Sequence, residues 1–161
     1  MMVMQKFSTH GFEFEFEDNT GVVLEHFERA LELGLNEIGE RAVEYARAEL
    51  RKSKPYREGA PGKPAIDTSA LYESVGYYVD EDEVYIGAGG PSIDYASVIE
   101  FGSGKFSTLG GGTPKESWLY KDEFGQWHMG FPMKPRPFIA PAAKEHTKEY
   151  RDVLEEFLEN A

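Results

Sequence analysis

Residues 21–52 read GVVLEHFERALELGLNEIGERAVEYARAELRK, and this stretch decides the fold. Its apolar residues recur at steps of three and four: Leu24, Phe27, Leu31, Leu35, Ile38, Ala42, Ala46 and Leu50. This spacing predicts one long amphipathic helix that ends before Pro55. Gly34 and Gly39 lie inside it, where glycine costs about 1 kcal/mol relative to alanine. They predict that another element packs closely against the helix.

The segment before this helix alternates strictly. Residues 11–17 read GFEFEFE, which puts three phenylalanines on one face and Glu13, Glu15 and Glu17 on the other. The alternation predicts a strand with one buried side. Glutamates two apart on a strand point the same way but spread along it, so we expect a solvated acidic face rather than a cation site.

The middle third predicts two short helices around a hairpin. Residues 67–69 are of N-cap types, and a helical turn is expected around Leu71. Residues 74–79 and 83–88 predict two antiparallel strands. A second short helix is expected to end at Gly102.

A last amphipathic helix is expected over about residues 141–158, where Pro141 occupies the first turn. These elements predict a single domain of 161 residues that contains a long N-terminal helix, a C-terminal helix and short antiparallel strands. The predicted core covers about residues 11–52, 67–101 and 132–159, and two long loops cover about residues 53–66 and 102–131.

Composition limits the class of function. The chain has no cysteine, which excludes disulfides and thiolate metal sites. No run approaches the ~20 apolar residues of a membrane span, and residues 1–10 lack the apolar segment of a secretory signal. The 29 acidic and 17 basic residues give a formal charge of −12, which argues against a general nucleic-acid binder.

A cluster of basic residues spans the end of the long helix and the first loop: Arg51, Lys52, Lys54, Arg57 and Lys63. A single acid, Glu58, lies among them. The cluster predicts either a mobile, solvated loop or a contact with an acidic neighbour, such as another copy of this acidic protein.

Aromatic residues gather on the second loop: Trp118, Tyr120, Phe124, Trp127 and Phe131. Residues 118–121 and 126–129 flank a turn, which predicts a projecting hairpin. The aromatic side chains either pack locally on the body or form a protein-binding arm, since aromatic residues anchor interfaces. Loops of this length are often functional.

The known catalytic patterns are missing from the sequence. The glycines near 102–104 and 110–112 fit neither phosphate-binding fingerprint, the four histidines share no metal spacing, and there is no Gly-x-Ser-x-Gly elbow. Carboxylate pairs of the glycosidase kind stay open because acids are abundant, but no pattern supports one. We therefore expect no cofactor, no metal and no enzyme activity.

Three motifs follow one another along the chain: DTSAL at 67–71, YASVIEFGS at 95–103 and PRPFIAPA at 135–142. They resemble the patterns DTGxL, YAxxxEFGT and PxPFxxPA of the head–tail joining, or tail-completion, proteins of long-tailed double-stranded-DNA bacteriophages and their prophages. The resemblance covers about residues 20–160. It implies an α+β fold, with the long N-terminal helix and the C-terminal helix packed on a small antiparallel sheet, and it implies that the two long loops are assembly loops. The chain departs from these patterns at Ser69, Ser97 and Ser103, where glycine, proline and threonine are usual.

The resemblance implies structural rather than catalytic roles for the motif residues: Asp67, Thr68, Leu71, Tyr95, Ala96, Glu100, Phe101, Gly102, Pro137, Phe138 and Pro141. On physical grounds, Asp67 or Thr68 is expected to cap the turn at Leu71, and Phe138 is expected to fill the core. The Glu100 carboxylate is expected to accept backbone N–H groups of Gly102–Gly104 or to pair with Arg136.

The resemblance further implies a virion protein of the neck, at the head-proximal end of the tail, that is assembled in the host cytoplasm. It implies a homo-oligomeric ring, commonly a hexamer, between connector or stopper proteins and the tail terminator or tube. DNA passes through such a ring without sequence-specific binding, and an acidic wall repels its phosphates. The candidate lumen acids are Glu13, Glu15, Glu17, Glu25, Glu32 and Glu40.

Two alternatives stay open. A tail terminator of the same machine caps the growing tube, and the sequence does not separate it from a joining protein. A small hydrolase or a glycan-binding module that uses the hairpin within 113–131 belongs to a different class of function.

Overall fold

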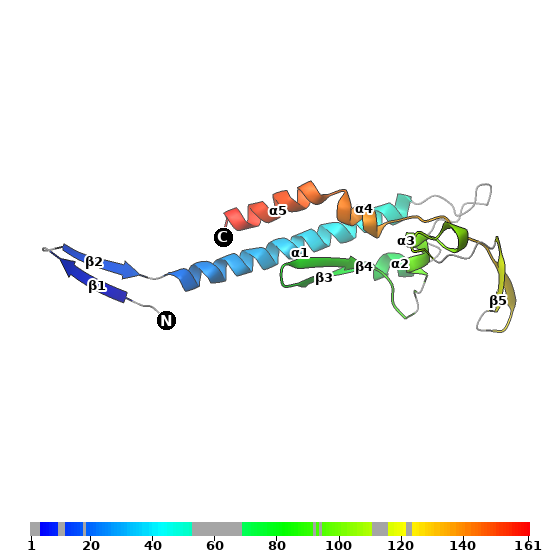
Figure 1. The fold of residues 1–161 in the computed structure, drawn as a ribbon, viewed down its shortest axis with the longest axis horizontal. Coiled ribbons are helices and arrows are strands. Elements are labelled where there is room, and N and C mark those ends of the chain that lie inside the picture. Colours follow the sequence, from blue (N-terminus) through cyan, green and yellow to red (C-terminus); the bar gives the residue numbers. More distant parts are fainter. Residues whose placement is uncertain are drawn as a thin grey trace.

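The computed structural model is built on one long helix with shorter elements along its sides (Figure 1). It describes residues 4–9, 12–17, 19–52, 69–91, 93, 95–110, 116–121 and 124–161, and of the first two ranges it describes the backbone alone. Helix α1 covers Thr20–Lys52 and is about 50 Å long at 1.5 Å per residue. The predicted long helix over 21–52 is confirmed.

The strands of the described residues form three antiparallel hairpins: β1 (Met4–Thr9) with β2 (Phe12–Glu17), β3 (Gly76–Asp80) with β4 (Glu83–Gly87), and β5 (Trp118–Lys121) with β6 (Trp127–Gly130). The α+β class is thus confirmed, with separate hairpins in place of one sheet. β3 and β4 pack along α1. β1 lies outside every predicted strand because its sequence, MQKFST, lacks an alternating apolar pattern.

Short helices complete the chain: α2 (Ser69–Ser74), α3 (Ala96–Phe101), the 3₁₀ turn η1 (Gly104–Phe106), α4 (Ile139–Lys144) and α5 (Thr147–Glu159). The prediction of one helix over 141–158 is wrong, because α4 and α5 are separated at Glu145–His146, where His146 has a φ angle of −109° and a ψ angle of 15°. There the His146 ring lies flat on the Tyr45 ring of α1, with centroids 3.4 Å apart. We attribute the break to this stack.

Helix α5 and the β3–β4 hairpin pack against two different sides of α1 (Figure 1). A Cβ atom on Gly34 would lie 2.9 Å from Leu154 Cδ1 of α5. A Cβ atom on Gly39 would lie 2.1 Å from Tyr77 Cδ2 of β3. The close packing predicted from these two glycines is therefore confirmed, with one glycine at each contact.

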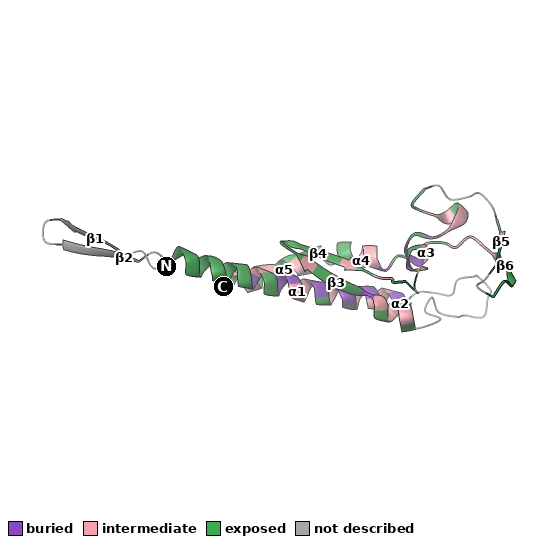
Figure 2. Cartoon of the chain, turned by 90° about the horizontal axis from the view of Figure 1, so that it is seen from below, coloured by how far each residue is buried: buried purple, intermediate pink, exposed green. Residues whose placement is uncertain are grey.

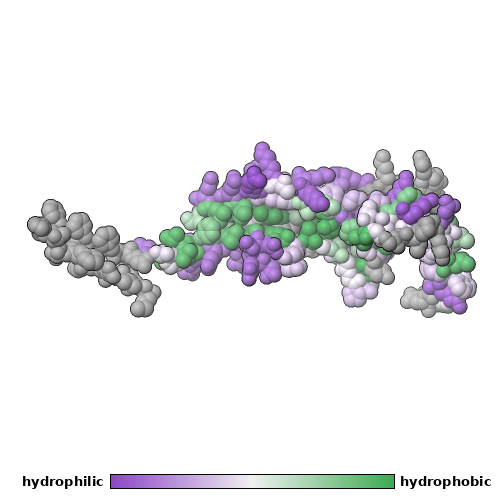
Figure 3. All heavy atoms as spheres, viewed as in Figure 1, coloured by the Kyte–Doolittle hydropathy of each residue, from purple (hydrophilic) through white to green (hydrophobic). Residues whose placement is uncertain are grey.

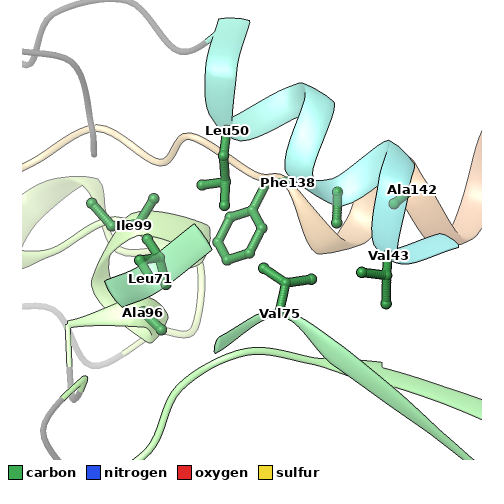
Figure 4. Close-up of a cluster of buried hydrophobic side chains, with 9 residues drawn as sticks. Val43, Leu50, Leu71, Val75, Ala96, Ile99, Phe138 and Ala142 are labelled. Carbon is green, nitrogen blue, oxygen red and sulfur yellow. The ribbon is translucent and has the colours of Figure 1, made fainter. Parts of the chain in front are cut away.

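The buried core surrounds the C-terminal half of α1 (Figure 2). Its main cluster is Val43, Ala46, Leu50, Leu71, Val75, Ala96, Ile99, Phe138 and Ala142 (Figure 4). In contrast, residues 20–29 at the N-terminal end of α1 are all exposed. Leu24 and Phe27, which the apolar spacing places on the buried face, are among them.

The chain exposes a large surface for its size. Its solvent-accessible area is 12111 Å², whereas a compact monomer of 18.2 kDa exposes roughly 8,000 Å². Within the described residues, no helix combines the length and the apolar character that a membrane crossing requires.

We expect Gly39→Ala to lower the free energy of unfolding by about 1–3 kcal/mol, because the Tyr77 ring occupies the space that the new methyl group needs. On an exposed helix face the same change stabilises by about 1 kcal/mol, so the sign of the effect reports the contact. Urea unfolding followed by circular dichroism measures it.

Gly21→Ala is the matched control in the same helix, since a methyl group on Gly21 would meet no atom within 4 Å beyond its chain neighbours and the adjacent helix backbone. We expect this variant to be as stable as the wild type or slightly more stable. A Gly39→Ala protein with undiminished stability would contradict the close approach of β3.

Candidate functional site

The second and third sequence motifs lie side by side near the C-terminal end of α1. The backbone N–H of Arg136 donates to the Ile99 carbonyl at 2.8 Å, and the N–H of Ser103 donates to the Met133 carbonyl at 2.8 Å. The N–H of Met133 in turn donates to Ser103 Oγ at 3.0 Å. These bonds join the end of α3 to the segment that leads into α4, and we call this connection the joint.

The Glu100 carboxylate crosses from α3 to the start of α4, although Glu100 is only 7% exposed. Its Oε2 accepts the N–H groups of Phe138 and Ile139 at 2.7 and 3.0 Å. Its Oε1 accepts the N–H of Ala140 at 2.9 Å. The carboxylate thus satisfies donors that the first turn of a helix leaves without intrahelical partners, at the positive end of the helix dipole.

The predicted partners of Glu100, namely Gly102–Gly104 or Arg136, are therefore wrong. The physical reason is the path of the chain after residue 131. It returns alongside α3, and this places the start of α4, rather than the turn after Phe101, over the carboxylate. Nothing local to residues 95–104 indicates this long-range return.

Gly102 is required by the same joint. Its φ angle is 76°, in the left-handed region that favours glycine. A Cβ atom there would lie 2.8 Å from the Met133 carbonyl oxygen and 2.9 Å from that of Phe106. The motif glycine therefore permits the close approach of the two segments.

Phe138 is 1% exposed and fills the core, as predicted. Figure 4 shows its ring among side chains of α1, α2 and α3, including Leu50, Leu71 and Ile99. Ala96 is also buried, whereas Phe101 lies at the surface. Because the side chains around Phe138 and Ala96 come from four helices, these two motif residues hold the fold together.

The remaining motif residues have varied positions: Tyr95 is half-buried beside the core, Pro137 is exposed, Pro141 lies in the first turn of α4, and Leu71 is fully buried. Asp67 and Thr68 lie outside the described residues, so their capping role stays a prediction.

An open pocket adjoins this joint and is lined by Gly87, Ala88, Ala96, Ser97, Glu100, Phe101, Phe138, Ile139 and Ala140. Its lining is mostly apolar. Its one carboxylate is committed to three backbone N–H groups. In the part of the chain that the structure describes, no group of three histidine, aspartate or glutamate residues is placed to hold a metal ion.

Comparisons with known proteins give no relative for this chain. No protein-family model, curated protein or solved structure matches it. The roles of the motif residues therefore follow from their own geometry, and that geometry is of a structural joint.

The aromatic hairpin β5–β6 projects at the far end of the molecule from the C-terminus (Figure 1). Phe124 and Trp127 are 81% and 65% exposed, and Tyr120 is also exposed. Trp118 is half-buried at the base of the hairpin, where its ring lies against Gly104 and Gly130. Phe131 is half-buried as well. Three of the five predicted rings are thus exposed, and a protein-binding arm stays a prediction.

Arg51 and Lys52 are exposed at the C-terminal end of α1, where Lys52 pairs with Glu49 at 2.8 Å. The Arg51 guanidinium lies 4.8 Å from the centroid of the Tyr72 ring and donates to its hydroxyl. The other predicted interface bases, Lys54, Arg57 and Lys63, lie outside the described residues.

The candidate lumen acids fall into two groups. Glu25, Glu32 and Glu40 are exposed on α1. The side chains of Glu13, Glu15 and Glu17 lie outside the described part of the chain.

A polar network that sequence reasoning missed joins α5 to α1. Glu149 accepts the Tyr45 hydroxyl at 2.5 Å and Arg41 Nη1 at 2.8 Å. Arg41 Nε also pairs with Glu37 at 2.7 Å, and this pair, four residues apart on one helix, was the only sequence signal of the network. The bonds from Tyr45 and then Arg41 lower the pKa of the Glu149 carboxyl from its ordinary value of 4.5.

A carboxyl group whose pKa is lowered by folding stabilises the fold above its unfolded pKa, and this stabilisation is lost as the pH falls through the lower folded pKa. We therefore expect Glu149→Gln to melt at a lower temperature than the wild type at pH 7. The difference should close as the pH falls below about 4.5, because the protonated carboxyl then resembles the amide.

Melting temperatures across this pH range measure the effect. Glu155→Gln is the control on the same helix, since Glu155 is exposed. We expect it to follow the wild type at every pH. A Glu149→Gln curve parallel to that of the wild type would contradict the role of the ionised carboxylate.

Proposed function

We propose that this chain is a non-enzymatic virion protein that joins the tail to the head of a long-tailed double-stranded-DNA bacteriophage or prophage. The observation that carries the proposal is the joint at Glu100, whose carboxylate binds the second motif to the third. The resemblance of the ordered motifs implies such structural roles for these residues. The joint supports that expectation for Glu100, Gly102 and Phe138.

The shape of the molecule supports a role in assembly. A joining protein contacts neighbours on several sides, and the described residues leave both residues 20–29 of α1 and the β5–β6 arm exposed. Under this proposal the neighbours are further copies in a ring, commonly a hexamer, together with connector or stopper proteins and the tail terminator or tube. No membrane partner is proposed.

The acidic side of α1 fits the passage of DNA through such a ring. Glu25, Glu32 and Glu40 are seven and eight residues apart, so they share one side of α1, and all three are exposed. Facing the lumen, they would repel phosphate and let the DNA slide without sequence-specific contacts.

Deleting the gene from a prophage that carries it tests the proposal. After induction we expect electron micrographs of DNA-filled heads separated from tails of normal length. Adding the purified protein to this lysate should restore joined, infectious particles, whereas adding a heat-denatured sample should not.

Other outcomes of the deletion overturn the proposal. Tails of abnormal length would assign the chain to the tail-terminator alternative, because a missing terminator leaves tube growth uncapped. Complete, joined particles without the protein would exclude a joining role and favour the hydrolase or glycan-binding alternative.

A further inference from the structure

One face of the β5–β6 arm is mostly apolar and exposed to solvent. In the antiparallel register Leu119 pairs with Met129 and Lys121 pairs with Trp127, so these four residues share one face. All four are exposed, and Lys121 Nζ lies 4.9 Å from the centroid of the Trp127 ring. We call them the arm face. Tyr120 and His128 pair on the opposite face, where their rings stack.

An isolated two-stranded hairpin is marginally stable in water. A contiguous apolar face of this kind on a soluble protein marks a site of interaction. We therefore expect the arm face to bind a partner, because the described residues of the same chain leave it exposed.

A second exposed apolar surface lies on the N-terminal third of α1. Val23, Leu24, Phe27 and Leu31 recur at helical spacing on one face, and the first three are exposed while Leu31 is half-buried. We call them the α1 stripe. Figure 3 shows an apolar band along α1 with hydrophilic side chains above and below it. The candidate lumen acids lie on another side of the helix, so a neighbour on the stripe leaves them free.

Charge is separated between the two ends of the molecule. Segments 51–66 and 102–137 carry ten of the 17 basic residues but only four of the 29 acids. Their described parts lie at the C-terminal end of α1 and beyond it (Figure 1).

The surroundings of the α1 stripe are acidic. From Glu25 to Glu44, α1 carries six glutamates and two arginines. Helix α5 carries five acids and two bases. The β3–β4 turn consists of four consecutive acids, residues 80–83.

We infer that the arm face of one copy docks on the α1 stripe of a second copy, head to tail. The arm and the stripe lie near opposite ends of α1, so one copy cannot bring its own two surfaces together (Figure 1). In the contact, Trp127 and Leu119 cover apolar helix surface, and the basic end of one copy meets the acidic flanks of the next.

Each copy offers one surface of each kind. A standard interface buries roughly 800 Å² per partner, and each copy in a head-to-tail series contributes both an arm and a stripe. Such heterologous pairing closes into a ring or continues as a filament. This inference adds a specific contact between copies to the ring of the proposed function. It rests on the proposed function only for the expectation that the series of copies closes into a ring.

Complementation between two variants tests the pairing with purified full-length protein. The arm variant is Leu119→Thr with Trp127→Thr, and the stripe variant is Leu24→Gln with Phe27→Gln; all four positions are exposed, so both proteins are expected to fold. In analytical ultracentrifugation we expect the wild type to assemble and each variant alone to associate at least ten-fold more weakly. Mixed together, the two variants should form a 1:1 dimer that cannot grow, through the one intact arm and the one intact stripe.

Tyr120→Thr, on the opposite face of the arm, is the matched control and should assemble like the wild type. Because the chain has no cysteine, single cysteines can also map the contact. A short bismaleimide linker should join Met129→Cys of one copy to Glu28→Cys of another, but not two copies of Met129→Cys. Association should also weaken as the salt concentration rises.

Three results overturn the inference. One is a wild type that stays monomeric up to about 100 μM, far above a micromolar Kd. Another is a stripe variant that pairs with itself, which would indicate a symmetric arm-to-arm contact. The third is a mixture of folded variants that forms no dimer. Each is independent of the deletion experiment, so the pairing and the joining function can fail separately.

Discussion

Glu100→Gln is expected to lower the melting temperature by about 10 °C. The wild-type carboxylate accepts three backbone N–H groups at the start of α4. The amide keeps the shape of the side chain but turns one acceptor into a donor that faces a backbone N–H. With hydrogen bonds to charged groups contributing about 1.5–3 kcal/mol each, a net loss of about 3 kcal/mol is expected, and each 1 kcal/mol corresponds to about 2–4 °C for a domain of this size.

Differential scanning calorimetry measures this change against two further variants. Glu44→Gln alters an exposed glutamate of α1 and should shift the free energy of unfolding by less than about 0.5 kcal/mol. Glu100→Asp keeps the charge but shortens the side chain, so it should lose part of the hydrogen bonding. Its melting temperature should lie between those of Glu100→Gln and Glu44→Gln. An unchanged melting temperature for Glu100→Gln would remove the structural role assigned to this carboxylate.

The sequence predicts most elements whose signal is local. The spacing from Leu24 to Leu50 predicts α1, and Gly34 and Gly39 predict close contacts that the structure then assigns to α5 and β3. The β3–β4 and β5–β6 hairpins also follow from short alternating or flanking patterns. Each of these inferences needs only residues within a few positions of one another.

Features that depend on distant residues escaped prediction. The Glu100 carboxylate meets N–H groups 38 to 40 positions further along the chain. The bonds of Glu149 to Tyr45 and Arg41 join residues 104 and 108 positions apart. Spacing within a segment carries no information about which segment returns to cover it.

The N-terminal third of α1 marks a different limit. Its periodicity places Leu24 and Phe27 on the same apolar face as buried Leu35 and Ala42, yet both are exposed in the single chain. A helical period tells which face avoids water but not whether the cover comes from the same chain. Burial by a second copy would reconcile the pattern with the exposure.

Phe138→Ala is expected to lower the free energy of unfolding by about 3–5 kcal/mol, the usual cost of removing a buried phenylalanine ring. The loss combines the transfer free energy of the ring with the cavity it leaves between α1, α2 and α3. Little collapse is expected, because Leu50 and Leu71 around the ring are fixed on separate helices. Chemical unfolding at equilibrium measures the change.

Two other variants make the result specific to this core position. Phe138→Leu keeps most of the volume and should lose less than about 1.5 kcal/mol. Phe124→Ala removes the same ring from the exposed turn of the arm and should change stability by less than about 0.5 kcal/mol. If Phe138→Ala were as stable as Phe124→Ala, the ring could not be a main support of the core. If it folded normally but failed to restore joined particles in the deletion lysate, the third motif would serve contact with a partner rather than the fold.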